Sequence, residues 1–390
     1  MFAAPKGGNG VSDLFAMDAS PRNAKESIKI IGVGGGGNNA LNHIIRSGLK
    51  GVEFLAANTD VRNLEQSAAE TRITLGQNLT KGLGAGGNPL VGASAAKESA
   101  DSIKNYLKGA DMVFLTAGMG GGTGTGASPV IASIARDLGV LVVAVVTRPF
   151  SFEGKKRMDQ AMEGIRQLRE QVDAFIMISN DRLLALAEKN DSLLAMFAMA
   201  DDVLRQAVQG VSDLILRPGK INVDFADVRS VMTDAGIAIM GIGRASGKDR
   251  ALAAAETALR SPLMEVPMKG AKGVLFNITG GPDMSLHEVY AVSDVLSGAT
   301  HEEANVIWGH VQDGSMEDEV EVTVIATGFP DDYMQSCEEN RDFALLGEKR
   351  PPLLNKAKIH QKTQQQQQEE EPDASASKNG ILRRPHRDHS

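Results

Sequence analysis

The chain has 390 residues, of which 42% are hydrophobic, and this length is enough for two ordinary domains and an appendage. Its formal net charge of −8 excludes a generic nucleic-acid-binding protein, because such proteins carry a basic face. The single cysteine, Cys337, excludes an intramolecular disulfide and fits a reducing cytosol. The longest aliphatic run, 140–146, is too short to span a bilayer, and residues 1–23 have no signal-peptide core. These features predict a soluble, cytoplasmic protein.

The first predicted strand, residues 28–33, runs into a glycine-rich turn that opens a helix reaching Leu49. Three glycines of this turn, Gly32, Gly34 and Gly37, satisfy the spacing G-x-G-x-x-G. That spacing is typical of turns that bind the pyrophosphate of a dinucleotide, but it is a weak signal by itself. A nicotinamide-dependent dehydrogenase is therefore a competing interpretation at this point of the chain.

Two observations count against the dehydrogenase. Its ribose-binding acid would be Asp60, at the end of the second strand, but a second glycine loop at 118–126 has no place in that scheme. In addition, Asn38 and Asn39 put polar amides where the first helix is expected to begin. These amides either contact a nucleotide or cap the helix.

Another glycine-rich stretch, residues 82–89, follows a short predicted strand at 71–75. Asn88 and Pro89 are typical of the first residues of a helix, so this stretch also lies between a strand and a helix. Several glycine loops in that position indicate one phosphate chain approached from several sides. A loop that is merely mobile is the alternative interpretation.

The stretch 118–126, Gly-Met-Gly-Gly-Gly-Thr-Gly-Thr-Gly, follows an apolar run at 111–117 that predicts a buried strand, and residues 127–138 have helical spacing. Backbone N–H groups and the helix dipole favour an anion at such a turn, and glycine lets the backbone approach it closely. Thr123 and Thr125 add hydroxyl donors. We interpret the loop as a phosphate cradle, with a flexible surface turn as the alternative.

Glu153 and Arg157 follow the next predicted strand, residues 141–147. Their i,i+4 spacing is that of a surface ion pair, which stabilises a helix only weakly. However, they lie just beyond the carboxyl end of a strand, where doubly wound sheets bind ligands. This position makes contact with a ligand the alternative interpretation.

A long helix is expected over 192–216, after a strand at 175–178. Apolar residues surround most of its circumference, which predicts a helix buried between two domains. Asp201 and Asp202, near its middle, then need partners: one pairs at the domain boundary and the other reads a base. A carboxylate accepts well from the N1–H and N2–H groups of guanine, which adenine cannot match.

Asp224 and Asp227 lie at i and i+3, on one face of the first turn of a helix that Asn222 is expected to cap. Acidic residues are favoured at a helix N-terminus by the dipole alone. The residues by themselves therefore do not decide between this structural role and a catalytic one.

Residues 235–327 alternate strands and helices without another glycine-rich nucleotide loop, which predicts a second domain of the α+β class. His287 and His301 are isolated and lack metal-ligand spacing, so no metal-binding residue is predicted. Beyond residue 330, the glutamine run 364–368 and the acidic run 369–371 indicate a chain that cannot bury enough surface to fold.

The sequence Gly-Gly-Gly-Thr-Gly-Thr-Gly at 120–126 resembles the signature of the tubulin superfamily, and the chain from about Ile28 to Phe329 resembles the FtsZ family of bacterial cell-division GTPases. The resemblance implies nucleotide contacts from Gly35, Gly36, Gly37, Asn38, Asn39, Gly120, Gly121, Gly122, Thr123, Gly124, Glu153, Arg157, Asn180 and Asp201. It assigns Ala85, Gly86 and Gly87 to the γ-phosphate, and Asn222, Asp224 and Asp227 to a catalytic loop that enters the site of the next subunit.

The implied fold class is α/β: a Rossmann-like parallel-sheet GTP-binding domain, a long central helix, a second α+β domain and a disordered C-terminal tail. The expected boundaries are a disordered extension at 1–26, the GTP-binding domain at 27–191, the central helix at 192–216, the second domain at 217–329, a disordered linker at 330–380 and a partner-binding peptide at 381–390.

The resemblance also implies GTP or GDP and Mg²⁺ as cofactors, and head-to-tail filaments of the chain itself. It implies adaptor and regulatory partners at residues 381–390, an indirect link to the membrane, no nucleic-acid partner, and a cytoplasmic location at the mid-cell division site. A nucleotide-binding scaffold that polymerises without turnover is the non-enzymatic alternative. The chain departs from the family pattern in the peptide 381–390, and at Ser179, Lys220 and Ser128, where proline, an aliphatic residue and alanine are usual.

Overall fold

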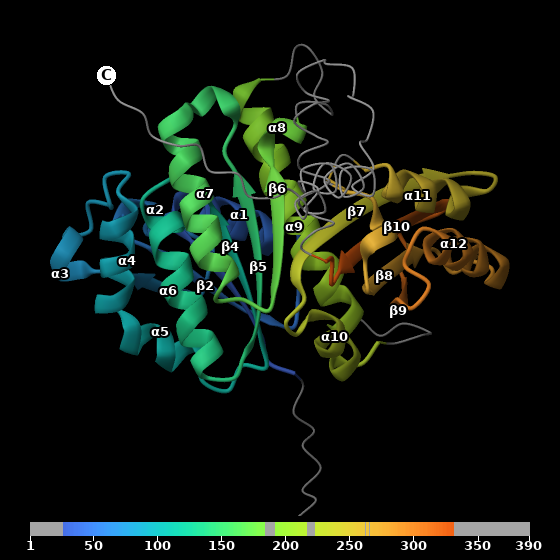
Figure 1. Ribbon diagram of the computed structural model, residues 1–390, viewed down its shortest axis with the longest axis horizontal. Coiled ribbons are helices and arrows are strands. Elements are labelled where there is room, and N and C mark those ends of the chain that lie inside the picture. The colour runs from blue at the N-terminus through green and yellow to red at the C-terminus, as the bar shows by residue number, and fades with distance from the viewer. Residues whose placement is uncertain (1–25, 184–191, 217–222, 262, 265, 331–390) are drawn as a thin grey trace, which may run out of the picture. The chain divides into compact units, whose positions relative to one another are not determined.

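The computed structural model describes residues 26–183, 192–216, 223–261, 263–264 and 266–330. The predicted N-terminal extension up to residue 25, the linker, the C-terminal peptide and Asn222 lie outside these residues. The described strands form one ten-stranded sheet with the order β3-β2-β1-β4-β5-β6-β7-β10-β8-β9 (Figure 1).

The first six strands are all parallel, as the alternation of strands and glycine-led helices predicts. They are β1 (Ile28–Val33), β2 (Val52–Asn58), β3 (Thr71–Thr74), β4 (Met112–Gly118), β5 (Leu141–Arg148) and β6 (Ala174–Ser179). β1, β4 and β5 are buried along almost their whole length, which is typical of parallel strands covered on both faces. Their carboxyl ends lie at one edge of the sheet, so the loops that follow them gather there.

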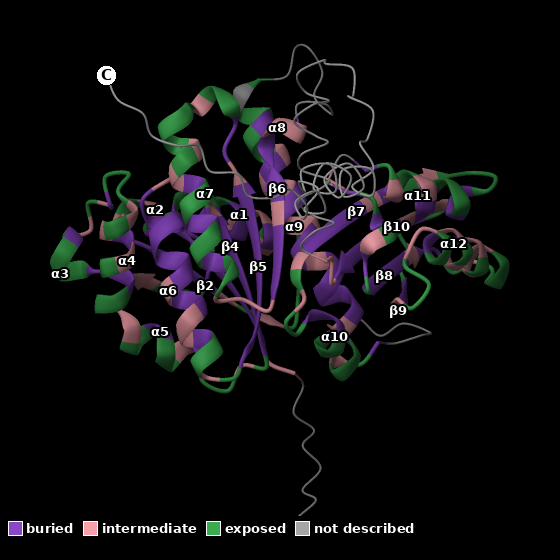
Figure 2. Cartoon of the chain, in the orientation of Figure 1, coloured by how far each residue is buried: buried purple, intermediate pink, exposed green. Residues whose placement is uncertain are grey.

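Helices cover both faces of this parallel sheet. They are α1 (Gly34–Arg46), α2 (Val61–Glu65), α3 (Gln77–Thr80), α4 (Pro89–Glu98), α5 (Ala100–Leu107), α6 (Thr123–Asp137), α7 (Lys155–Arg169) and α8 (Asn180–Leu183). Apolar residues of α1 pack into one core, whereas those of α4 to α7 pack into a second core on the other face. Figure 2 shows the strands as the buried layer, with exposed residues on the outer sides of the helices.

The C-terminal half extends the same sheet. Its elements are α10 (Phe225–Met232), β7 (Gly236–Ser246), α11 (Arg250–Leu259), β8 (Gly273–Gly280), α12 (Leu286–Gly298), β9 (Asn305–Gln312) and β10 (Glu319–Thr327). β10 is antiparallel to β7 and β8, and three residue pairs join β7 in parallel to β6. The predicted α/β and α+β parts are confirmed, but they share one sheet.

The helix α9 (Leu193–Leu216) connects the two halves and has 24 residues, so it is roughly 36 Å long at 1.5 Å per residue. Its apolar residues lie in the same core as residues from β1 and from β10, which confirms a helix buried between the two halves. The first turns differ from the expectation, because Leu194 is 81% exposed and Phe197 is 39% exposed. Within the described ranges, none of the helices combines the length and the apolarity needed to cross a bilayer.

Candidate nucleotide site

The helix α1 begins directly after β1, and α6 begins after a short loop that follows β4; both lack a side-chain cap and an acidic residue in the first turn. By contrast, side chains of Asn88, Asp224 and Ser285 cap α4, α10 and α12. The first N–H groups of a helix have no partner within the helix, and they lie at the positive end of its dipole. The starts of α1 and α6 are therefore suited to bind an anion such as a phosphate.

The starts of α1 and α6 pack backbone against backbone, and glycine makes this contact possible. A Cβ atom on Gly34 would lie 2.8 Å from the amide nitrogen of Gly124, and one on Gly36 would lie 3.3 Å from the Cα of Gly118. Gly34 also has a φ of +71°, which side chains rarely tolerate. The structure therefore brings the glycine-rich turn after β1 and the glycine loop at 118–126 together, and it shows that their glycines serve packing.

The helix α6 begins at Thr123, four residues before the expected start, so half of the predicted cradle is the first turn of the helix. The Oγ1 atoms of Thr123 and Thr59 are 2.6 Å apart, which joins the start of α6 to the end of β2. Thr125 is 1% exposed, and its Oγ1 accepts from the backbone N of Gly120 at 2.8 Å. Thr125 therefore holds the shape of the loop rather than lying open to a ligand.

The glycine-rich stretch at 82–89 lies against the start of α6, as expected for loops that surround one phosphate chain. A Cβ atom on Gly122 would lie 2.9 Å from both the Cβ of Ala85 and the N of Asn88. Gly86 and Gly87 are exposed, and a Cβ atom on either would meet nothing within 4 Å. This loop thus presents two open glycines beside the helix start.

Glu153 and Arg157 form an ion pair at 3.0 Å, with Glu153 at the end of a 3₁₀ turn (Ser151–Glu153) and Arg157 in α7. The side chain of Glu153 is only 11% exposed, and its Oε1 accepts from the backbone N of Phe150 at 2.9 Å. Arg157 packs against the cradle, because a Cβ atom on Gly120 would lie 2.8 Å from its Cγ. The predicted ion pair is therefore present, and its position beside the cradle also fits the predicted ligand contact.

Asp201, which is half-buried, and Asn180, which is buried, both carry side-chain oxygens without a hydrogen-bond partner among the described residues. Asn180 is 5% exposed, and its Oδ1 has no hydrogen-bond partner among the described residues. Burial raises the pKa of Asp201 to about 7, and this carboxylate also has no partner in the described part of the chain. Asp202, in contrast, pairs with Arg205 at 2.7 Å. Asp202 thus pairs within its own helix, and the reading of a base by Asp201 stays a prediction.

Three phenylalanines that the sequence interpretation missed lie next to these groups. The rings of Phe150 and Phe152 stack at 5.0 Å, and those of Phe150 and Phe197 meet edge to face at 5.5 Å. Phe152 is 60% exposed, and Phe197 lies one turn before Asp201 on α9. Such exposed rings offer apolar faces to a planar base. Their signal was an aromatic pair directly after a strand in a chain with only 4% aromatic residues.

Asn38 and Asn39 are not at the start of α1, which begins at Gly34, so neither caps the helix. Asn38 is 1% exposed, and its Nδ2 donates to the Oδ1 of Asn63 at 2.9 Å, whereas its Oδ1 is buried without a partner in the described residues. Asn39 is exposed. The capping alternative is therefore wrong for both.

The predicted catalytic residues Asp224 and Asp227 lie at the start of α10 and not at the glycine loops. α10 begins at Phe225, and Asp224 is its N-cap, because the Oδ1 of Asp224 accepts from the backbone N of Asp227 at 2.8 Å. The expectation that Asn222 caps this helix is therefore wrong. Asp224 and Asp227 are both exposed. α8 and α10 lie at opposite ends of α9 (Figure 1), so the structure does not bring these carboxylates to the glycine loops of their own chain.

Comparison with known proteins decides the family. The GTPase-domain model of the Tubulin/FtsZ family matches residues 27–188, and the C-terminal-domain model of the FtsZ family matches residues 236–330. The cell division protein FtsZ of Pseudomonas aeruginosa is 57% identical over 302 residues, which is 77% of each chain. The chain belongs to the FtsZ family.

Solved structures agree with this assignment. An FtsZ dimer from M. jannaschii matches with a TM-score of 0.76 and 44% identity, covering 79% of this chain and 89% of that one. A protofilament structure of CetZ2 from Haloferax volcanii shares the fold, with a TM-score of 0.69 at 21% identity over 82% and 98% of the two chains. As an FtsZ-family cell-division protein with this GTPase domain, the chain is a filament-forming GTPase.

The dehydrogenase interpretation is wrong, and the structure shows what its proposed acid does. Asp60 is the N-cap of α2, and its Oδ1 accepts from the backbone N of Arg62 at 3.0 Å. Its carboxylate therefore serves its own helix instead of a ribose.

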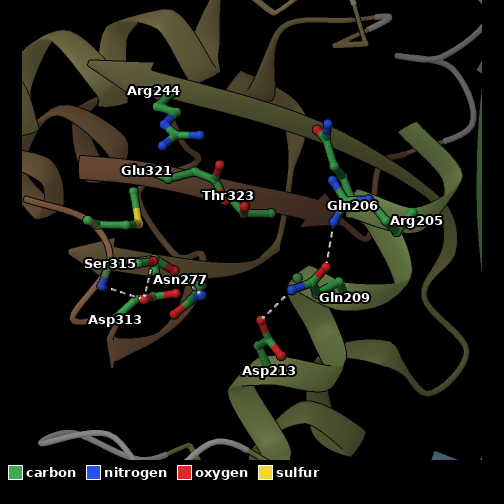
Figure 3. A pocket seen from close by; sticks show the side chains of 13 residues that line it. Arg205, Gln206, Gln209, Asp213, Arg244, Asn277, Asp313, Ser315, Glu321 and Thr323 are labelled. Carbon is green, nitrogen blue, oxygen red and sulfur yellow. Dashed lines mark hydrogen bonds between the residues drawn. The ribbon is translucent and has the colours of Figure 1, made fainter. Parts of the chain in front are cut away.

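This FtsZ-family chain also has a polar cleft of about 260 Å³ between α9 and the C-terminal half of the sheet (Figure 3). On the α9 side, Arg205 donates to Gln209 at 2.5 Å, and Gln209 donates to Asp213 at 3.3 Å. On the sheet side, burial raises the pKa of Glu321. No glycine-rich helix start lines this cleft, so it is distinct from the candidate nucleotide site.

Proposed function

We propose that GTP binds at the edge of the sheet formed by the loops after β1, β3, β4, β5 and β6, and that subunits assemble head to tail so that the start of α10 completes the site of the next subunit. The observation that carries this proposal is a separation. α8, which directly follows the carboxyl end of β6, and the helix α10 with its exposed Asp224 and Asp227 lie at opposite ends of α9, which is roughly 36 Å long (Figure 1). A carboxylate at the far end does not reach its own γ-phosphate, whereas a translated copy presents it.

The phosphates occupy the starts of α1 and α6, and Ala85, Gly86 and Gly87 approach the γ-phosphate. The base lies against the aromatic rings, where Asp201 and Asn180 accept from and orient guanine. The proposed nucleotide contacts are Gly35, Gly36, Gly37, Asn38, Asn39, Gly120, Gly121, Gly122, Thr123, Gly124, Glu153, Arg157, Asn180 and Asp201. The unpartnered buried oxygens and the uncapped helix starts support this set, because a bound nucleotide satisfies them.

The catalytic residues are Asp224 and Asp227, together with Asn222, and they position or polarise the attacking water in the neighbouring subunit. Phosphoryl transfer leaves little covalent chemistry to the protein, so positioning and charge stabilisation dominate. When bound, Mg²⁺ neutralises charge on the phosphates. Mg²⁺ would be held mostly by phosphate oxygens, hydroxyls and water, because this ion keeps several waters when it binds with a nucleotide. Among the described residues, no group of three His, Cys, Asp or Glu side chains is arranged to hold a metal.

The family assignment supports the wider proposal. The domains are a GTP-binding domain at 27–191, the central helix at 192–216 and a C-terminal domain at 217–329, followed by a linker at 330–380 and a peptide at 381–390 that binds adaptor and regulatory proteins. The protein acts in the cytoplasm at the mid-cell division site and reaches the membrane only through those partners. The FtsZ dimer and CetZ2 protofilament structures support self-association along one axis.

The experiment that tests the composite site compares Asp224→Ser and Asp227→Ala with a control, Asp101→Ala, an exposed aspartate in the first turn of α5. Serine keeps the cap of α10 and removes the charge. Both test variants bind GTP normally and lose turnover by about 10²- to 10⁴-fold, whereas the control keeps it.

Mixing two variant subunits distinguishes a site that the next subunit completes from a site that is complete within one subunit. A subunit with Asp201→Ala binds GTP poorly but carries intact catalytic residues, so it restores phosphate release at the GTP held by the Asp227→Ala subunit. Loss of GTP binding by isolated Asp224→Ser or Asp227→Ala monomers contradicts head-to-tail completion. A rate of phosphate release per subunit that is independent of protein concentration also contradicts head-to-tail completion. Filaments that form without GTP turnover indicate the non-enzymatic alternative, a nucleotide-binding scaffold.

A further inference from the structure

Arg148 and Ser179 are the last residues of the neighbouring strands β5 and β6 and lie side by side in the parallel register. A terminal guanidinium nitrogen (Nη2) of Arg148 donates to the Oγ of Ser179 at 2.9 Å. Ser179 is only 2% exposed, and the Nε of Arg148 is buried without a hydrogen-bond partner among the described residues. A hydrogen bond with a charged donor at a buried position is stronger than a neutral bond in water. This bond therefore ties the two strand ends together.

A second bond ties the same two segments on the other side of Asn180. The backbone N of Ser151 donates to the Oδ1 of Asp181 at 2.9 Å. The residue before Asn180 is thus bonded to the last residue of β5, and the residue after it is bonded to the segment that follows β5. Asn180 itself is 5% exposed, and the Oδ1 of its amide has no partner in the described part of the chain. These two bonds therefore hold the chain on either side of Asn180, while its own Oδ1 is left for a ligand.

We propose that Arg148 positions Asn180 for the nucleotide base through its bond to Ser179, so that base selection depends on a residue that does not touch the base. This inference rests on the proposed nucleotide site. The hydroxyl of serine can accept such a bond, so the bond from Arg148 restrains the residue that directly precedes Asn180.

The bond acts on binding more than on chemistry. Asn180 is proposed to contact the base, far from the bond that breaks, so a misplaced Asn180 raises the KM for GTP more than it lowers kcat. Because guanine and adenine differ at the edge that the amide contacts, the preference for GTP over ATP also narrows.

The test uses the full chain after removal of nucleotide, with titrations of GTP and ATP and a thermal unfolding curve for each variant. Ser179→Ala and Arg148→Met each raise the Kd for GTP about three- to tenfold, the effect expected of one lost hydrogen bond. Ser179→Thr keeps the hydroxyl and restores affinity. Arg260→Met is the matched control and leaves the Kd unchanged, because Arg260 is the C-cap of α11 and its side chain is 79% exposed.

A double-mutant cycle separates positioning from other roles. If Arg148 acts through Ser179 and Asn180, Arg148→Met adds nothing to Ser179→Ala, and neither adds to Asn180→Ala. Additive effects overturn the inference, as does Arg148→Met weakening GTP while Ser179→Ala does not, because Arg148 then contacts the nucleotide itself. A loss of unfolding free energy as large as the loss of GTP-binding free energy also overturns the inference, since the role of the bond is then only structural.

The failure of the proposed function has a different signature. If the unaltered chain does not bind GTP, or if Asn180→Ala leaves the Kd unchanged, the proposed site is wrong and this inference is wrong with it. If Asn180→Ala weakens GTP while Ser179→Ala and Arg148→Met do not, the site stands and only the positioning role is overturned.

Discussion

The starts of α1 and α6 differ from the start of α12 in whether side chains accept hydrogen bonds from the backbone N–H groups of the first turn. At α12, Ser285 and Glu288 cap each other: the backbone N of Ser285 donates to Glu288 at 2.7 Å, and the Oγ of Ser285 accepts from the backbone N of Glu288 at 3.3 Å. At α1 and α6, no side chain caps the helix. The chain thus caps the start of α12 with its own side chains and leaves the starts of α1 and α6 without a side-chain cap at the nucleotide face; α11, in the C-terminal half, also lacks a side-chain cap.

Buried charges show the same contrast. Arg250 is 5% exposed and pairs with Glu288 and Asp283, each at 2.7 Å, and hydrogen bonding to Glu288 raises the pKa of Arg250. Asp201 at the nucleotide face has a raised pKa and no such partner. Unpaired buried polar groups cost free energy, and a bound ligand can offset that cost. The charge of Arg250 is thus balanced within the fold, whereas Asp201 has no cation paired with it among the described residues.

The largest effect is expected at the contact between the two open helix starts. Gly34→Val puts a branched side chain at a φ of +71° and against the amide of Gly124, so we expect at least about 100-fold weaker GTP binding and a loss of about 1–3 kcal/mol of stability. Gly35→Ala is the matched control, because a Cβ there meets nothing within 4 Å of the protein. It keeps the unfolding midpoint, and any loss of GTP affinity it causes reports contact with the phosphates. Equal behaviour of the two variants in calorimetric titration contradicts this prediction.

Asp201 is expected to give the next largest effect, about 1.5–3 kcal/mol of GTP affinity in Asp201→Ala. Its pKa of about 7 lies above the ordinary value, so in the nucleotide-free protein its stabilising contribution is full below about pH 4 and is lost as the pH rises through about 7. Guanine needs the ionised carboxylate, so GTP affinity rises between pH 6 and pH 8. Asp201→Asn should flatten both profiles. A GTP/ATP preference that survives in Asp201→Ala moves base recognition to Asn180.

A smaller effect is expected at the threonines of the cradle. Thr123→Val replaces a hydroxyl with a methyl group of similar size, removes the bond to Thr59 and weakens GTP by about 1–2 kcal/mol. Thr125→Val removes the acceptor for the N–H of Gly120, so it lowers stability as well as affinity. Unfolding curves and titrations of both variants separate the two roles. An unchanged GTP affinity in Thr123→Val removes this residue from the site.

The smallest effect on GTP affinity is expected at the start of α12, which its own side chains cap. Ser285→Ala removes the cap of α12 and lowers the free energy of unfolding by about 1 kcal/mol, measured by chemical denaturation. GTP affinity stays unchanged, because this helix start serves the fold alone. A loss of affinity comparable to that of Thr123→Val breaks the distinction between open and closed helix starts.

The strands were the most predictable part of the fold. The strands expected to begin at residues 28, 71, 111, 141 and 175 lie within a residue or two of their bounds in the structure. Buried apolar runs flanked by glycine predict the position of a strand closely. The helix starts were less predictable. Glycine lowers helix propensity, so the sequence delays α6 to residue 127, whereas packing of its first turn on Gly34 and Ala85 overrides that propensity. Asn222 and Asp224 are both good caps by residue type, and only the folded chain selects Asp224.

By itself, the sequence determined the chemistry of this protein: glycine-led helix starts after parallel strands, a carboxylate on a buried helix and a second acidic pair beyond it. These features follow from local propensity and periodicity, which residue order carries directly. Only the tertiary structure decided which groups meet. It joined β6 to β7 in one sheet, packed the starts of α1 and α6 together at Gly34 and Gly124, and linked Arg148 to Ser179 by a hydrogen bond. It also used α9 to separate Asp224 and Asp227 from the phosphate loops, because contacts between distant residues depend on how whole elements pack.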